Sequence, residues 1–270
     1  MQHQMRGVSA SSLAEVIATV ESVAGSGVEV SSQLFAAVSA IDGAPALRRV
    51  LTDPSTDASA KQALVRDVFG SAFGSDAVRV LETATAGRWA SPRDFTDGVE
   101  TAGVTAQVVA ADAAGELDAL ETELFEIGRT VHSDDELRGV IADRTVPADA
   151  KASLLTSLFG GNVSDSSLAL AVQAAVARRG SFERTLTEFG DTAAARRDRL
   201  LAEVRVAYEL GESEKQRLAA ALSAKYGRDV HLNIVVDPSV VGGIAVSVGD
   251  ELVDGTMSTR LETARRQLAG

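Results

Sequence analysis

The chain has 270 residues, a length that favours more than one compact domain, and its 45% hydrophobic and 24% charged residues are typical of a folded protein. Its net charge of −12 opposes binding to nucleic-acid phosphates and to anionic lipid surfaces. The absence of cysteine excludes disulfides and thiolate metal sites, and no apolar run is long enough to predict a membrane span. Together with an N-terminus that lacks a signal-peptide pattern, these features predict a cytosolic protein.

Helical periodicity dominates the first 200 residues. Helices are expected over residues 11–23, 32–41, 76–86, 115–130, 167–177 and 182–201. Two further helices carry the apolar stripes Ala60, Leu64, Val65, Val68, Phe69 and Ala150, Leu154, Leu155, Leu158, Phe159. Asp57 and Pro147 are expected to open these two helices, and Gly70 and Gly160 to end them in a left-handed conformation.

The chain partly matches itself when it is shifted by 90 residues. The matching pairs are Leu34-Phe35 with Leu124-Phe125, Asp53 with Asp143, Ala60-Lys61 with Ala150-Lys151, Phe69-Gly70 with Phe159-Gly160, and Arg88 with Arg178. The match needs no gap, and an ordered set of this kind is rare by chance. It predicts a duplicated helical bundle, with one copy at residues 1–104 and the other at 105–202.

Period-two alternation replaces the helical pattern after residue 202. Strands are expected near residues 204–208, 230–236 and 244–248, and a further strand after the glycine at 249. A helix over 212–226 is expected to start with a capping box of Ser213 and Gln216 and to stop at Gly227, and a last helix is expected over 258–268. The fold class is therefore mainly α with a small α/β C-terminal domain, residues 203–270, of element order β-α-β-β-β-α.

The glycines of this domain are those of turns and not of a phosphate loop. Gly242-Gly243 lies between two strands, and no lysine follows it, whereas a phosphate loop joins a strand to the start of a helix. The glycine pair suits a bend or bulge after the Asp237-Pro238 turn. Gly249-Asp250 suits a two-residue hairpin.

The same stretch, VVDPSVVGGIAVSVGDELVDGTMSTRL, carries a resemblance. Its ordered residues are Asp237, Pro238, Ser239, Gly242, Gly243, Gly249, Asp250, Asp254, Gly255, Thr256, Arg260 and Leu261. This pattern resembles the signature of the delta subunit of bacterial rotary (F-type) ATP synthases, whose mitochondrial counterpart is the oligomycin-sensitivity-conferring protein. LTDPSTDASAKQAL and IADRTVPADAKASLL are similar to a stretch of that family's helical bundle. The usual member has one bundle, so the chain resembles a long form in which either copy can carry the family's role.

The resemblance implies a non-catalytic stator subunit of the proton-translocating ATP synthase, which links the catalytic head to the peripheral stalk so that rotor torque is resisted. It implies that the bundle binds N-terminal helices of the alpha subunits and that the C-terminal domain binds the b subunit of the stalk. It also implies a peripheral position at the cytoplasmic face of the cell membrane, with no cofactor. Leu64, Val68, Leu154 and Leu158 line either a partner groove or the bundle core.

The remaining polar residues do not form a catalytic set. His3, His132 and His231 lie far apart in sequence, whereas a zinc site needs clustered donors. The acidic run 134–136 opens a helix, where carboxylates favour the helix dipole over a bound cation. Trp89 is expected to plug a bundle end. Two alternatives stay open: a helical adaptor unrelated to ATP synthesis, and a small α/β enzyme, which would need a clustered acid–base pair.

Overall fold

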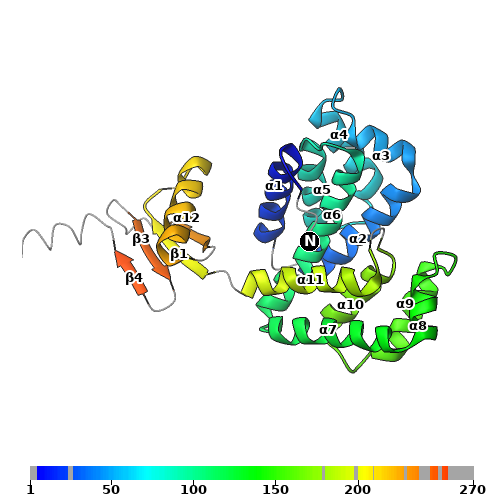
Figure 1. The fold of residues 1–270 in the computed structure, drawn as a ribbon. Helices are drawn as coiled ribbons and strands as arrows, with labels where there is room; N and C mark the ends of the chain where they lie inside the picture. The colour runs from blue at the N-terminus through cyan, green and yellow to red at the C-terminus, as the bar shows by residue number, and fades with distance from the viewer. Residues whose placement is uncertain are drawn as a thin grey trace, which may run out of the picture. The chain divides into compact units, whose positions relative to one another are not determined.

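The computed structural model describes residues 5–23, 27–177, 180–197, 200–208, 210–227, 230–236, 244–248 and 251–254. The protein is mainly helical with a small sheet, and it divides into a helical unit, residues 1–194, and an α/β unit, residues 195–270 (Figure 1). Among the described residues, the helical unit contains two hydrophobic cores and the α/β unit contains one.

The helices of the first unit follow one another with short connections. They are α1 (Val8–Ser22), α2 (Gly27–Gly43), α3 (Pro45–Thr52), α4 (Ala58–Phe69), α5 (Ser75–Ala86), α6 (Pro92–Ala113), α7 (Leu117–Ser133), α8 (Asp135–Ala142), α9 (Ala148–Phe159), α10 (Asp165–Ala175) and α11 (Phe182–Arg197). Sequence periodicity did not predict α6. Its start nevertheless carries a cap signal, because the Ser91 side chain accepts a hydrogen bond from the Asp94 amide and Pro92 occupies the first turn.

The helix positions repeat with the 90-residue period of the sequence. Helices α2 to α6 start at residues 27, 45, 58, 75 and 92, and helices α7 to α11 start at 117, 135, 148, 165 and 182. We call α1–α6 the first set and α6–α11 the second set. The expected boundary between residues 104 and 105 falls inside α6, which Figure 1 shows running through the helical unit.

Helix α6 belongs to both sets because it contributes to two cores. Phe95 and Val99, near its start, are fully buried in the first core. Val104 and Val108, further along the helix, are buried in the second core. The end of the first set is therefore also the beginning of the second, and no linker separates them.

Two details of the helix ends differ from the sequence expectation. Asp57 occupies the N-cap position of α4, but its side chain makes no capping hydrogen bond. Gly70 ends α4 with φ −65°, a right-handed value, because the Gly70 amide continues the helical pattern by bonding to the Arg66 carbonyl. Near the second expected site, the left-handed residue is Gly161, with φ 78°, and not Gly160.

The α/β unit contains β1 (Leu200–Val206), α12 (Glu212–Tyr226), β2 (Val230–Val236), β3 (Ile244–Val248) and β4 (Glu251–Asp254). The sheet order is β2-β1-β3-β4. Strand β1 is parallel to β2 and antiparallel to β3, and β3 is antiparallel to β4. The core of this unit consists of Val204, Val206, Leu210, Leu222, Val230 and Val246. The order β-α-β-β-β is as predicted, and the helix expected over 258–268 lies outside the described residues.

The start of α12 corrects another expectation. The N-cap is Gly211, and the Glu214 carboxylate reaches back to accept a hydrogen bond from the Gly211 amide at 2.9 Å, so the expected pair Ser213 and Gln216 is not the capping box. Gly227 ends the helix with φ 67°, as predicted.

Candidate partner-binding surfaces of the helical unit

The acidic run at the start of α8 has a structural role. The Asp134 side chain accepts hydrogen bonds from the amides of Glu136 and Leu137, both at 3.0 Å. It therefore caps two amides that have no partner within the helix. Over the part of the chain that the structure describes, no group of three or more His, Asp and Glu side chains is arranged to hold a metal ion.

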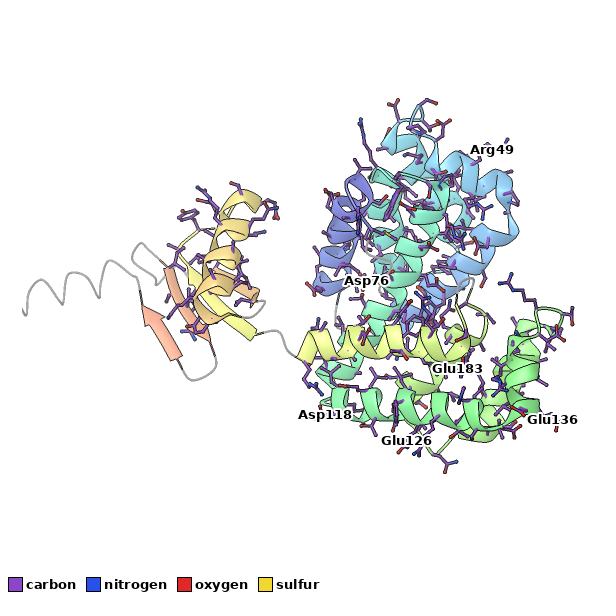
Figure 2. The ribbon with its side chains drawn as sticks, viewed as in Figure 1. Arg49, Asp76, Asp118, Glu126, Glu136 and Glu183 are labelled. Carbon is purple, nitrogen blue, oxygen red and sulfur yellow. The ribbon has the colours of Figure 1, made fainter. Side chains whose placement is uncertain are left out.

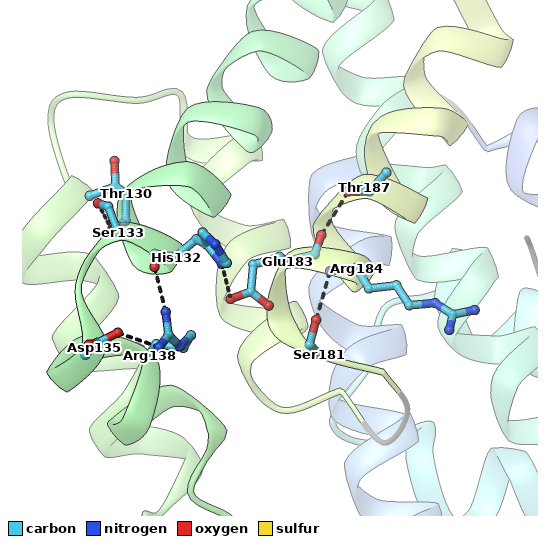
Figure 3. Close-up of polar contacts among 9 residues, drawn as sticks. All are labelled: Thr130, His132, Ser133, Asp135, Arg138, Ser181, Glu183, Arg184 and Thr187. Atoms are coloured by element: carbon cyan, nitrogen blue, oxygen red, sulfur yellow. Dashed lines mark hydrogen bonds and ion pairs between the residues drawn. The ribbon is translucent and has the colours of Figure 1, made fainter.

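His132 takes part in a polar network that joins α7, α8 and α11 (Figure 3). Its Nδ1 atom lies 3.9 Å from the Glu183 carboxylate, and its carbonyl accepts a 2.8 Å hydrogen bond from Arg138. Arg138 also pairs with Asp135. Burial raises the pKa of Glu183, but hydrogen bonds to Ser181 and to the backbone and the nearby His132 and Arg138 outweigh it and lower the pKa below its usual value. The network brings the ends of three helices close to one another.

The Asp and Lys residues that recur in both sets are also structural. The Asp143 carboxylate accepts hydrogen bonds from the Thr145 amide and hydroxyl, both at 2.8 Å. Asp53 makes the same pair of bonds to the Ser55 amide, 2.8 Å, and hydroxyl, 2.7 Å. Each carboxylate thereby closes the turn that joins two helices, and these bonds hold the pKa of both groups below the usual range.

The recurring lysines, Lys61 and Lys151, are both only 6% exposed. The Lys151 ammonium donates to the carbonyl of Ile141 at 2.7 Å and to that of Ala175 at 3.4 Å. These carbonyls lie at the ends of α8 and α10, where backbone acceptors lack helical partners and a positive charge is favoured. Burial lowers the pKa of Lys61. Lys151 thus joins the ends of two helices.

The four leucine and valine candidates separate into two equivalent pairs. Leu64 and Leu154 are half-buried and pack against the first and the second core, respectively. Val68 is 42% exposed and Leu158 is 45% exposed, on α4 and α9. The first pair therefore contributes to the cores. A partner role for the second pair stays a prediction.

Phe125, in α7, was not among the sequence candidates, yet its side chain is 71% exposed, which is the largest value among the exposed large hydrophobic residues of the described chain. Its neighbour Leu124 is buried in the second core. The exposed Asp118 and Glu126 lie on the same helix (Figure 2), and the exposed Arg129 follows Phe125 by one turn. The repeated Leu-Phe pair was the signal for this position in the sequence. Leu124 lies in the second core, whereas Phe125 does not.

The family signature falls almost entirely outside the described residues. These positions are Asp237, Pro238, Ser239, Gly242, Gly243, Gly249, Asp250, Gly255, Thr256, Arg260 and Leu261. The remaining residue, Asp254, ends β4 and pairs with Ala245 of β3. Val248 pairs with Glu251 across the two intervening residues, so the flanking strands have the register of the expected hairpin.

These features define a class of protein. The polar clusters just described close turns and join helix ends, and exposed apolar side chains lie on α4, α7 and α9. Such a protein is a helical scaffold whose described polar clusters are structural. Among the residues that the structure describes, no helix is both long enough and apolar enough to cross a membrane.

Comparison with known proteins gives the family. Residues 104–268 match the family described as the ATP synthase delta (OSCP) subunit. A protein named ATP synthase subunit delta from Kineococcus radiotolerans is 44% identical over 88% of this chain and 86% of its own. Proteins of the same name from Streptomyces avermitilis, 43% identical over 90% and 89%, and Thermobifida fusca, 37% identical over 98% and 100%, are also similar. The chain belongs to the ATP synthase delta (OSCP) subunit family.

Membership confirms the prediction made from the signature and settles which set carries the family pattern. The chain is a non-catalytic stator component of an F-type ATP synthase, and it is not an enzyme in its own right. The alternatives of an unrelated adaptor and of a small α/β enzyme are thereby set aside. The match begins at residue 104, inside α6, so it covers most of the second set and the α/β unit. The relative from Thermobifida fusca matches over 98% of this chain, so the first set also occurs in related proteins.

Proposed function

We propose that the second set binds N-terminal helices of the alpha subunits and that the α/β unit binds the b subunit of the peripheral stalk. The observation that carries this proposal is the family match over residues 104–268, which spans both parts. The chain would then lie at the cytoplasmic face of the cell membrane as a peripheral part of the complex. The exposed Leu158 offers the second set an apolar contact for such a helix.

The mechanical role sets the required affinity. A rotor that turns inside the head does work only if the head is held still, so the link must persist under the reaction torque. A dissociation constant of about 1 nM corresponds to about −12 kcal/mol. Amphipathic helices that lay their apolar faces into grooves reach such affinities.

We propose further that residues 1–104 and 105–202 arose by duplication of one bundle and that the first set extends the grip, either to a second alpha-subunit N-terminus or to the stalk. Its packing suits a load-bearing role. Gly27 of α2 lies so close to α6 that a Cβ there would be 2.7 Å from the Ala106 carbonyl. Close contact between helix backbones leaves little room for one set to shift against the other.

Reconstitution tests the assignment. Membranes stripped of this chain should lose coupling between proton flow and ATP synthesis and regain it when the full chain is added back. Calorimetric titration of the full chain with peptides of the alpha N-terminus and of the b C-terminus should give binding, and Leu158→Ser should weaken only the alpha peptide. Full coupling in stripped membranes, or no heat with either peptide, would remove the proposal.

A further inference from the structure

One pair of equivalent phenylalanines differs in burial between the two sets. Phe35 of α2 and Phe125 of α7 are 90 residues apart and follow the equivalent buried leucines Leu34 and Leu124. Phe35 is half-buried and packs against the core of the second set, across the boundary between the sets. Phe125 is 71% exposed. The same position on equivalent helices is therefore a contact point in one set and an exposed side chain in the other.

The reason lies in the residue that faces the ring. Gly103 of α6 has no side chain, and a Cβ at that position would be 2.6 Å from Cε1 of Phe35. The ring thus rests on a bare stretch of helix backbone. The equivalent helices, α7 and α11, are not packed along one another in this way, because α7 packs mainly against α6, α8 and α10. Phe125 therefore has no equivalent seat within its own set.

The rest of this helix face shows the same asymmetry. Two positions preceding Phe35, Gly27 and Ser31, are buried against neighbouring helices. Their equivalents one set later, Leu117 and Glu121, are only half-buried. Spaced four residues apart, Leu117, Glu121 and Phe125 share one face of α7. We call this stripe the α7 face.

The charge around the α7 face limits what can cover it. Helix α7 contains Asp118, Glu121, Glu123 and Glu126 but a single arginine, Arg129. One of these carboxylates, Glu123, is held by the amide and hydroxyl of Ser164 at 2.9 and 2.7 Å and faces α10. Asp118 and Glu126 are exposed on α7, and so is Arg129, which follows Phe125 by one turn. Carboxylates therefore outnumber the single arginine along this helix, a charge balance that is complementary to an apolar residue flanked by lysines or arginines.

We infer that the α7 face docks a basic amphipathic helix from another subunit of the complex, with a small residue, Gly or Ala, seated under the Phe125 ring. The seat of Phe35 on Gly103 is the template for this contact, because it shows what the same position accepts when it is covered. The inference rests on the proposed function, since it adds a second docking surface to the same stator.

Rebinding of the full chain to ATP synthase stripped of it tests the inference. Phe125→Ser should weaken rebinding about 30-fold, the typical loss when an aromatic anchor is truncated. Val50→Ser, at an apolar residue of the first set with 45% exposure, is the matched control and should leave rebinding unchanged. Both variants should melt at the temperature of the unmodified chain, because both side chains lie outside the cores. Equal affinity of the Phe125→Ser variant and the unmodified chain overturns the inference.

Charge and cross-linking identify the occupant. Glu126→Lys should weaken rebinding and make it less sensitive to salt, whereas tighter rebinding would contradict a basic partner. The chain has no cysteine, so Phe125→Cys can carry a photoreactive maleimide at a single site. In the assembled complex it should cross-link to a lysine- and arginine-rich helical segment of another subunit. The inference is overturned by a cross-link to a second copy of this chain, to residues 255–270 of the same chain, or to an acidic segment. The absence of any cross-link overturns it as well. If the unmodified chain itself failed to rebind to the stripped ATP synthase, the proposed function would be refuted instead.

Discussion

Replacing Lys151 with methionine tests the structural role of the recurring lysines. Methionine preserves the length of the apolar stem but removes the ammonium group that donates to the carbonyls of Ile141 and Ala175. A hydrogen bond to a charged group contributes about 1.5–3 kcal/mol, and a buried carbonyl left without a partner costs about 1–3 kcal/mol. The 2.7 Å bond is strong and the 3.4 Å bond is weak. We therefore expect Lys151→Met to lower the free energy of unfolding by about 3 kcal/mol.

Thermal melting followed by circular dichroism at the helical band gives the measurement. For a domain of 150–250 residues, a loss of about 3 kcal/mol lowers the Tm by roughly 6–12 °C. Lys215→Met is the control, because Lys215 lies on α12 and makes a surface ion pair with Glu212, which is worth about 0–1 kcal/mol. A Tm of Lys151→Met within about 1 °C of the unmodified chain would show that the carbonyls find other partners and that the lysine does not join the two helix ends.

Three other changes test separate parts of the helical unit. Gly98→Ala places a Cβ 2.4 Å from the Trp89 ring, which a 2.8 Å hydrogen bond to a backbone carbonyl holds in place, so we expect a loss of about 1–3 kcal/mol and an altered tryptophan emission. Ser91→Ala removes the cap of α6 and should cost about 1 kcal/mol in urea unfolding, whereas a gain would contradict the capping role. Glu123→Gln tests the pH dependence of stability: burial raises the pKa of Glu123, but hydrogen bonds from Ser167 and Ser164 outweigh burial and lower it. Because its pKa is lowered in the folded state, ionised Glu123 stabilises the fold at pH values above the ordinary pKa near 4.5, and this stabilisation is lost as the pH falls through the folded pKa. The free energy of unfolding of the variant should therefore fall less steeply with decreasing pH, and an unchanged slope would contradict this.

The sequence predicted most of the helices because most of them are amphipathic. Leu120, Leu124, Ile127 and Val131 recur on one side of α7, and this spacing is visible without any structure. The alternating strands of the α/β unit were visible for the same reason, with period two. The 90-residue repeat then located equivalent helices in the two sets.

Helix α6 was missed because it has no polar face. It packs against α1 and α2 of the first set and against α7 and α10 of the second, so residues 95–99 and 102–109 are buried all around the helix. Its sequence there is small and mixed, with Gly98, Gly103, Thr96 and Thr105 among valines and alanines, and shows no helical period. A helix shared by two cores is therefore hidden from periodicity, although its cap at Ser91 remains visible.

The α7 face was missed for a different physical reason. A repeat in sequence suggests a repeat in environment, and Leu34-Phe35 matches Leu124-Phe125. Burial depends on what lies opposite each residue: α2 packs along α6, where Gly103 receives the Phe35 ring, whereas α7 is not packed along α11 in this way. Gly103 lies in another helix, far along the chain, and only the structure relates it to the ring.

The shared helix also determines how force passes through the helical unit. In a chain of separate bundles, load crosses a linker, which bends before it transmits torque. Here the first and second cores are built on one continuous helix of 22 residues, with α2 packed along it at backbone contact distance. A pull on the first set therefore acts directly on helix α6 within the second core. For a stator component, whose work is to resist rotation, adding a set by sharing a helix lengthens the helical unit without adding a flexible joint.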